Sequence, residues 1–342
     1  MRAANIWSVP RLAAVGSLGI AQAIAAVPQL SDLSRKRPDR CADLPLNRMV
    51  PPTVLCVVSG MSPIDVILAP FHAGTQRRRV GNGPDRLLET GLVNRLRCNG
   101  RDVRIVELGS VDAFEGEIGR TFEVKRRVAS AVAAAVGNGR FPLVLAGNCN
   151  TSVGVHAGLG DQDIGVVWFD AHPDFNTPDE MASGYFDGMG VATLAGQCWH
   201  KLAASIASYA PLQLSRLVYC GIRDFEPGQR EKVEAHGIRA VYGGSRKPDD
   251  YADALGFCLN SFPPKALVHL DLDCLDTSVG HANGYAVPGG LSATDLNACL
   301  IRLVGQTSPV AMTIASFDPD YPGSDAIAAA GVDAAWIVAS AI

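Results

Sequence analysis

The stretch IGVVWFDAHPD, residues 164–174, changes abruptly from apolar to metal-binding side chains. Its first six residues form a continuous apolar run with several β-branched members, which is typical of a parallel strand covered on both faces. Asp170, His172 and Asp174 follow at spacings of two, so on an extended segment their side chains project to the same side. The stretch therefore predicts a buried strand that ends in a candidate ligand loop.

Similar apolar runs alternate with helical patterns along the chain. The predicted strands are Ile64–Ala69, Val103–Glu107, Pro142–Ala146, Ile164–Phe169, Arg216–Cys220, Ile238–Tyr242, Ala266–Asp271 and Val310–Ser316. The predicted helices are Asp85–Leu96, Arg120–Val136, Pro227–His236, Ala293–Val304 and Ser324–Ile342. This alternation without a break in composition predicts one α/β domain on a parallel sheet, with ligands bound beyond the carboxyl ends of its strands.

Composition excludes several classes of protein. The chain has 342 residues, of which 48% are hydrophobic and 19% charged, as in ordinary globular proteins. Its net charge of −4 gives no electrostatic footprint for nucleic acid, and no apolar stretch of membrane-spanning length follows residue 30. The nine cysteines form no CxxC pair, and several lie in apolar runs, which favours a reducing, cytoplasmic compartment.

Residues 1–60 are interpreted as an N-terminal extension, and the functional domain is expected over residues 61–342. The segment Leu12–Val27 is weakly apolar, like part of a targeting peptide, and residues 31–52 are polar and contain prolines. The alternatives are a disordered tail and an over-long gene start, with translation truly beginning at Met61. Candidate functional residues are therefore sought beyond the extension.

A second acidic loop follows the predicted strand Ala266–Asp271. Asp271 and Asp273 share one face, and two carboxylates at the end of a buried strand are costly unless they bind a cation or protons. We interpret Asp276 as the cap of the following turn. His269 shares the face of Asp271 but lies deeper in the strand, which favours a packed or ligand-supporting histidine over a ligand.

A third candidate loop, Gly147–Gly154, follows the predicted strand Pro142–Ala146. Gly147 allows a close backbone approach, Thr151 or Ser152 can cap a helix, and Cys149 would ionise readily near cations at a helix N-terminus. By itself this motif fits a buried structural cysteine equally well. Together the three loops supply four Asp, one His and one Cys, a set that suits Mn²⁺ better than Zn²⁺ and favours a two-metal cluster.

These loops, in this order, resemble those of the arginase (ureohydrolase) family. The family's Gly-Gly-Asp-His-Ser, Asp-Ala-His-x-Asp and Ser-x-Asp-x-Asp-x-x-Asp-Pro motifs correspond to Gly147–Thr151, Asp170–Asp174 and His269–Thr277. The resemblance extends over about residues 64–340. It implies a catalytic domain with a three-layer α/β/α fold around an eight-stranded, mainly parallel sheet.

The resemblance also implies a hydrolase with two Mn²⁺ ions per chain that cleaves a guanidino C–N bond in a small amino-acid substrate. The metal ligands that it implies are the bridging carboxylates Asp170 and Asp271, His172 and Asp273 on one ion, and Asp174, also assigned to catalysis, on the other. The implied substrate-binding residues are Asn176 and Ser183, which match positions that hold an α-carboxylate, and Glu226, which matches an acid facing the α-amino group.

The chain departs from the family pattern at three positions of the site. The motif histidine corresponds to Asn150, and because an amide is a poor Mn²⁺ ligand, the Cys149 thiolate is expected to take its place. Asp187 stands where the family has a proton-shuttling histidine and is therefore a catalytic candidate. Ser316 stands where a glutamate pairs with the substrate guanidinium, although Asp318 lies on the same face two residues later.

Loss of that glutamate penalises a strongly basic guanidinium more than a group that can be neutral near pH 7. The departures resemble the branch of the family that converts Nω-hydroxy-L-arginine to hydroxyurea and L-ornithine in the biosynthesis of the antibiotic D-cycloserine. Arginase, guanidinobutyrase or formimidoylglutamase activity and a catalytically silent, ligand-binding relative are the alternatives. Neither a nucleic acid nor a membrane is an expected partner, and the oligomeric state stays open.

Overall fold

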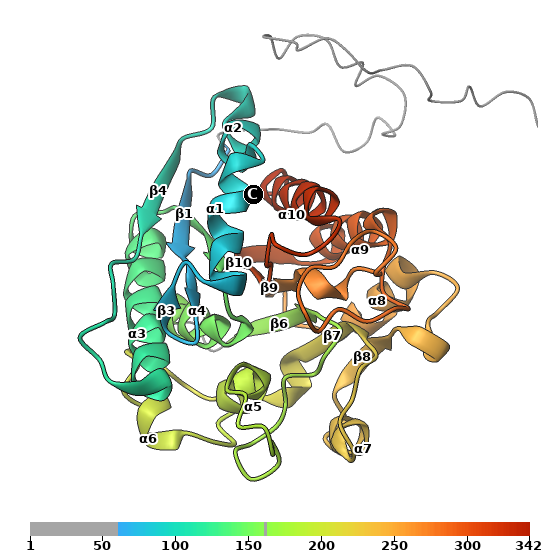
Figure 1. Cartoon of the computed structure of the whole chain (residues 1–342). Helices are drawn as coiled ribbons and strands as arrows, with labels where there is room; N and C mark the ends of the chain where they lie inside the picture. The colour runs from blue at the N-terminus through green and yellow to red at the C-terminus, as the bar shows by residue number, and fades with distance from the viewer. Residues whose placement is uncertain (1–60, 161–162) are drawn as a thin grey trace, which may run out of the picture. The chain divides into compact units, whose positions relative to one another are not determined.

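A computed structural model describes residues 61–160 and 163–342 of the chain, so the predicted extension over residues 1–60 lies outside the described residues. Eight strands form one sheet in the order β4-β1-β5-β10-β9-β6-β7-β8, and every neighbouring pair is parallel (Figure 1). The strands are β1 (Ile64–Ala69), β4 (Val103–Glu107), β5 (Phe141–Ala146), β6 (Ile164–Phe169), β7 (Leu217–Ile222), β8 (Arg239–Tyr242), β9 (Lys265–Asp271) and β10 (Ser308–Ala315). The predicted parallel sheet is therefore confirmed, with strand ends that agree within two residues.

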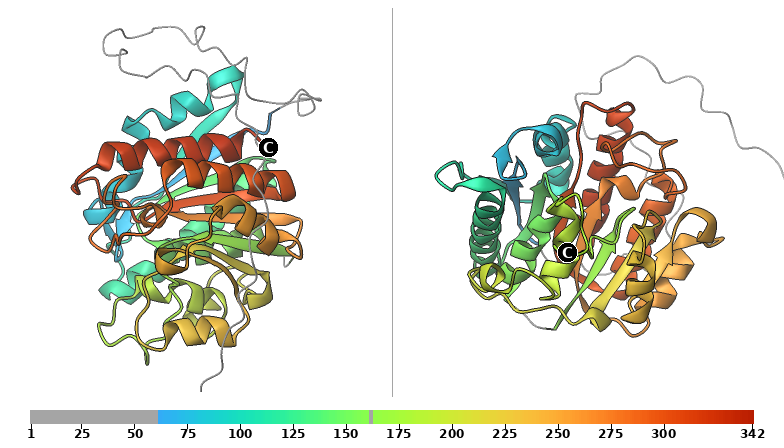
Figure 2. Two further views of the ribbon diagram at one scale, coloured as in Figure 1. Left: turned by 90° about the vertical axis from the view of Figure 1, so that its right-hand side faces the viewer. Right: turned by 60° about the horizontal axis from the view of Figure 1, so that its bottom comes forward.

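Helices cover both faces of the sheet, which gives the predicted three-layer α/β/α architecture (Figure 2). One face packs against α1 (Gly83–Glu89), α2 (Leu92–Leu96), α8 (Tyr251–Leu259), α9 (Ala293–Gln306) and α10 (Ser324–Ala339). The other face packs against α3 (Gly116–Gly137), α4 (Ser152–Leu159), α5 (Gly190–Leu194), α6 (His200–Ala203) and α7 (Gln229–Ala235). A two-stranded antiparallel hairpin, β2 (Phe71–His72) and β3 (Thr75–Gln76), follows β1.

Alternating side chains of each strand supply the two cores, as a sheet buried on both faces requires. In β9, Val268 and Leu270 face the α9 and α10 side, whereas Leu267 faces the α3 and α4 side. The register aligns the central strands, because Leu270 pairs with both Phe169 of β6 and Ile314 of β10. The loops that follow these strands consequently start at the same level on one edge of the sheet.

Two local predictions about helices were wrong. The segment predicted as one helix over Asp85–Leu96 forms two helices, because Gly91 adopts a left-handed φ of 96° between α1 and α2. The predicted Ser or Thr cap of α4 is also absent, since neither Thr151 nor Ser152 caps the helix through its side chain. The hydroxyl of Ser152 contacts Nδ1 of His269 instead, at 2.8 Å.

Candidate active site

A cavity of about 420 Å³ lies at the edge of the sheet where the three predicted loops end. Its lining includes six carboxylate side chains and one thiol, and none of its described lining residues is Lys or Arg. The acidic and thiol-bearing residues are Cys149, Asp174, Asp187, Asp224, Glu226, Asp271 and Asp273. A cavity with this charge is suited to a cationic ligand or to metal ions.

Asp170, His172 and Asp273 form the first group of possible ligands. Nδ1 of His172 lies 3.4 Å from Oδ1 of Asp170 and 3.3 Å from Oδ2 of Asp273. The peptide N–H of Ala171 donates to Oδ1 of Asp273 at 3.1 Å, which joins the loops after β6 and β9 directly. Their ligand atoms all lie within 4.8 Å of one another, so the three side chains can share one ion.

Cys149 forms a second group with Asp170, His269 and Asp271. Its Sγ lies 2.9 Å from Oδ2 of Asp271 and 3.2 Å from Nε2 of His269. The ligand atoms of Cys149, Asp170 and His269 also lie within 4.8 Å of one another. Because Asp170 belongs to both groups, the geometry is compatible with two neighbouring cations that share a carboxylate.

Asp174 completes the acidic set from a strained position. Its φ of 48° is left-handed, a conformation that is uncommon for a residue with a side chain. Its backbone carbonyl accepts a hydrogen bond of 2.8 Å from the N–H of Val191 in α5, which holds the turn in place. The buried carboxylate of Asp174 lines the cavity.

Burial and mutual repulsion disfavour the ionised forms of most of these carboxylates in the absence of a cation. Burial, reinforced by the charge of Asp273, raises the pKa of Asp170 to about 7. The same two causes raise the pKa of Asp271 well above its ordinary value, and burial together with Asp170 does so for Asp174. Although burial alone lowers the pKa of His172, neighbouring carboxylates led by Asp273 raise it well above its ordinary value. A divalent cation among these groups would stabilise their ionised forms, so the donor set fits a metal centre.

The third loop brings Cys149, not Asn150, to the cavity. Gly147 is essential there, because a Cβ atom would lie 2.0 Å from the carbonyl oxygen of Phe71. The side chain of Cys149 then lines the cavity, whereas Asn150 is buried beside Gly190 and does not line it. Of the two residues, only Cys149 thus faces the cavity, and its role as a metal ligand stays a prediction.

Comparison with known proteins agrees with this fold and arrangement. A model described as the arginase family matches residues 62–340. The chain belongs to the arginase family. An arginase of Bacillus caldovelox is 30% identical over 256 residues, which cover 68% of this chain and 83% of that relative. The solved arginase of Bacillus subtilis has a TM-score of 0.72 at 25% identity, covering 81% of this chain and 98% of that chain.

A further structural relative shows the same fold at lower identity. The arginase of Entamoeba histolytica, solved in complex with L-ornithine, has a TM-score of 0.71 at 20% identity, and the match covers 81% of this chain and 99% of that chain.

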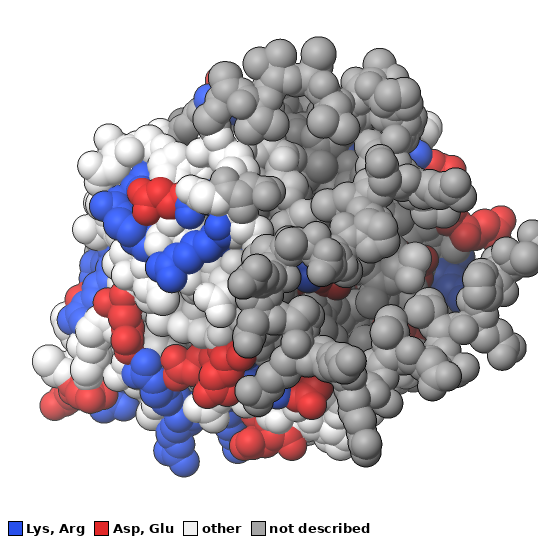
Figure 3. Space-filling view, turned by 90° about the horizontal axis from the view of Figure 1, so that it is seen from above, with Lys and Arg blue, Asp and Glu red and all other residues white. Residues whose placement is uncertain are grey.

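Among the described helices of this arginase-family chain, none has the length and hydropathy of a membrane span. On the face shown in Figure 3, the described Lys and Arg side chains are interspersed with Asp and Glu.

The three residues predicted to bind the substrate's amino-acid end all line the cavity of this arginase-family chain, but they differ in exposure. Ser183 and Glu226 line the cavity and are exposed at its mouth. Asn176 also lines the cavity, but its amide is already engaged, because Nδ2 donates to Glu226 at 3.0 Å and Oδ1 accepts from Gln229 at 3.2 Å. Gln229, which sequence reasoning missed, therefore braces this side of the cavity.

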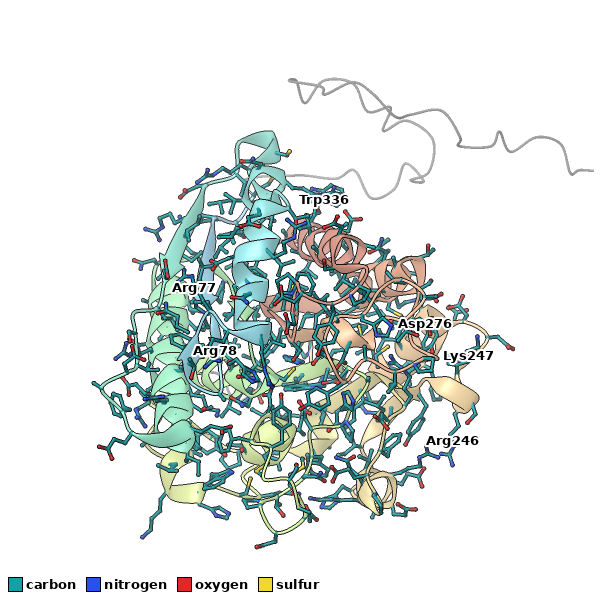
Figure 4. All side chains as sticks on the ribbon, viewed as in Figure 1. Arg77, Arg78, Arg246, Lys247, Asp276 and Trp336 are labelled. Carbon is teal, nitrogen blue, oxygen red and sulfur yellow. The ribbon has the colours of Figure 1, made fainter. Side chains whose placement is uncertain are left out.

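Ser316 reaches the metal-binding end of the cavity, and Asp318 does not. The hydroxyl of Ser316 lies 3.1 Å from Sγ of Cys149, whereas Asp318 is buried and is not a lining residue. Asp318 therefore does not replace the missing glutamate. Asp276, labelled in Figure 4, is the turn cap that was predicted, since its carboxylate accepts from the backbone N–H groups of Ser278, Gly289 and Gly290.

The supporting role expected of His269 agrees with the structure, whereas sequence reasoning missed Trp168 and Asn283 as hydrogen-bond donors to the aspartates. His269 stacks on Trp168 with ring centroids 3.5 Å apart, and these residues are direct partners in the β6–β9 register. Trp168 in turn donates to Oδ2 of Asp170 at 2.8 Å. Asn283 donates to Oδ2 of Asp273 at 3.1 Å and to the backbone carbonyl of Ser316 at 2.9 Å. Trp168 lies two residues before Asp170, as His269 does before Asp271, and this shared spacing was the one signal available in the sequence.

Proposed function

We propose that this arginase-family chain is a manganese-dependent hydrolase that cleaves a C–N bond in the guanidino-type group of an amino-acid substrate. The observation that carries the proposal is the convergence of His172, Asp174, Asp271 and Asp273 on one acidic cavity, with the buried Asp170 within ligand-sharing distance of His172 and Asp273. Buried carboxylates at this density are costly unless cations neutralise them. A protein that only binds an organic ligand would have no comparable reason to retain them.

The described side chains fit two Mn²⁺ ions. Asp170 and Asp271 are the proposed bridging ligands, with His172 and Asp273 on one side and Cys149 and Asp174 on the other. The hydrogen bonds from Trp168 to Asp170 and from Asn283 to Asp273 orient these carboxylates, a function usual for the residues around metal ligands. When bound, the metal ions would supply a nucleophilic water at neutral pH and polarise the substrate carbon.

We further propose Nω-hydroxy-L-arginine as the substrate, with hydroxyurea and L-ornithine as products. Ser316 presents a neutral hydroxyl next to Cys149, and Asp318 lies outside the cavity lining. A permanently charged guanidinium would lose a charge-assisted hydrogen bond there, worth about 1.5–3 kcal/mol, whereas a neutral N-hydroxyguanidine loses less. Arginase activity is the second candidate, because the curated relatives named above are arginases.

The α-amino acid end of the substrate is proposed to bind at the mouth of the cavity. Glu226 has one carboxylate oxygen bound to Asn176, and its other oxygen can accept from an ammonium group. Ser183 and Asn176 are the proposed partners of the α-carboxylate. For Asn176 this requires exchanging an internal hydrogen bond to Glu226 for one to the substrate, so substrate binding and the Glu226 contact are coupled.

Metal content and substrate preference test the proposal together. The full-length chain, purified and reconstituted, should contain about two Mn per chain. Its kcat/KM should be roughly tenfold or more higher for Nω-hydroxy-L-arginine than for L-arginine. A preference for L-arginine, guanidinobutyrate or formiminoglutamate would replace the proposed substrate, and a chain that binds no Mn would overturn the hydrolase proposal. The thiol-rich body favours a cytoplasmic location, which fractionation of the source cells would check.

A further inference from the structure

Asp187 lines the cavity, but the hydrogen bonds that its carboxylate accepts from the described residues come from the loop that carries Cys149. Oδ2 of Asp187 accepts from Nδ2 of Asn148 at 2.6 Å and from the backbone N–H of Cys149 at 3.2 Å. Oδ1 accepts from the backbone N–H of Asn150 at 2.8 Å. Three donors from consecutive residues thus converge on one buried carboxylate.

These hydrogen bonds fix the direction of the Cys149 side chain. The turn Cys149–Thr151 precedes α4, and its N–H groups are among those that a helix start leaves without an intrahelical partner. Asn148 is itself anchored, because its Oδ1 accepts from the N–H of Ala73 at 2.8 Å. With the backbone held on both sides, Sγ of Cys149 is directed to within 2.9 Å of Asp271.

Helix α3 packs against Phe186, the residue that precedes Asp187. Lys125 of α3 is fully buried, and its Nζ has no hydrogen-bond partner among the described residues. Nζ lies 4.5 Å from the ring centroids of Phe122 and of Phe186, and Phe186 directly precedes Asp187. Helices α3 and α4 touch here, since a Cβ atom on Gly154 would lie 2.4 Å from the carbonyl oxygen of Lys125.

We propose that Asp187, held through the packing of Phe186 on α3, fixes the turn Cys149–Thr151 by its three hydrogen bonds and is a positioning residue for Cys149. The inference rests on the proposed function, in which Cys149 is a metal ligand. Asp187 then places the thiolate rather than carrying protons to or from the substrate.

Cobalt substitution tests the positioning role by a readout other than activity. A thiolate bound to Co²⁺ gives a near-ultraviolet charge-transfer absorption. The Co²⁺-loaded wild type should show this band, and Cys149→Ser should abolish it. Asp187→Asn places an NH₂ group against N–H donors, so the band should fall to about half or less at full Co²⁺ loading. An unchanged band in Asp187→Asn together with a large loss of kcat would overturn the inference in favour of a proton-carrying Asp187.

The same measurement separates the inference from the function on which it rests. If the wild type lacks the band, the Cys149 ligand proposal fails and the inference fails with it. If the wild type has the band and only Cys149→Ser loses it, the ligand proposal stands and the positioning role is overturned.

Discussion

At the scale of single residues, Cys149 is the most constrained group of the site. Its Sγ touches Asp271, His269 and Ser316, and burial followed by the charge of Asp271 raises the pKa of the thiol well above its ordinary value. The thiol is therefore neutral until a cation displaces its proton. Metal binding at this position must release a proton and become tighter as the pH rises.

Replacing Cys149 should weaken one metal ion selectively. Cys149→Ser removes the thiolate, so one of the two Mn²⁺ ions is expected to bind at least roughly tenfold more weakly. Asn150→Ala should leave both affinities unchanged, because Asn150 does not line the cavity. Metal titration of both variants by calorimetry measures this difference, and equal losses in both would contradict the assignment.

Ser316 offers a test of substrate preference. Ser316→Glu introduces a carboxylate at the proposed guanidinium position, so kcat/KM for L-arginine should rise relative to that for Nω-hydroxy-L-arginine, by roughly tenfold. Ser316→Gln matches the size without the charge and controls for crowding against Cys149 and for the left-handed φ of 60° at this position. A similar shift in both variants would mean that charge does not set the preference.

The acidic residues predict an unusual dependence of stability on pH. The pKa of Asp170 is raised to about 7 in the folded, metal-free protein, so the stability from its bound proton is present at pH 4 and is lost as the pH rises through 7. The Tm of the EDTA-treated protein should therefore fall between pH 5 and pH 8. With saturating Mn²⁺ the fall should be much smaller, because the ions replace the protons; identical profiles with and without Mn²⁺ would argue against a metal centre here.

At the scale of elements, a few backbone positions decide where helices stop. Gly91 separates α1 from α2 with a φ of 96°, and a Cβ atom there would meet nothing within 4 Å. Gly137 ends α3 with the same open surroundings but without a left-handed φ. Both glycines lie at helix ends with room for a Cβ atom, and the left-handed φ of Gly91 distinguishes them.

Alanine substitutions at these glycines should change stability in opposite directions. Gly91→Ala should lower the free energy of unfolding by about 1 kcal/mol, because L side chains are strained in the left-handed region. Gly137→Ala should raise it by a few tenths to about 1 kcal/mol through better helix propensity. Urea denaturation of the metal-loaded protein measures both, and a stabilising Gly91→Ala would contradict the described turn.

At the scale of the whole molecule, local sequence patterns predicted the strands and the acidic loops but not the side-chain contacts that support them. The strands were readable because continuous apolar runs such as 164–169 have few alternatives, and the acidic loops were readable because each lies within a few residues. Contacts between distant residues were not readable. The hydrogen bonds from Gln229 to Asn176 and from the Cys149 loop to Asp187 depend on packing between elements that sequence spacing does not encode.

The boundary of the functional domain can be checked directly. A chain beginning at Met61 contains every described strand and helix and every proposed ligand. It should bind the same amount of Mn²⁺ as the full chain and unfold at a Tm within a few degrees of it. Loss of metal binding in the shorter chain, with its far-ultraviolet circular dichroism preserved, would show that residues 1–60 contribute to the site.

The strand order has a consequence for synthesis of the chain on the ribosome. Strands β9 and β10 are made last yet lie between β5 and β6, which carry Cys149 and Asp170. A nascent chain that has reached only residue 260 therefore has its sheet split into two halves with unpaired inner edges, and Asp271, one of the two proposed bridging ligands, is still untranslated. Closure of the sheet must wait for the final third of translation, and under the proposed function metal capture waits with it. Until then the exposed edges are the ones that chaperones would have to shield.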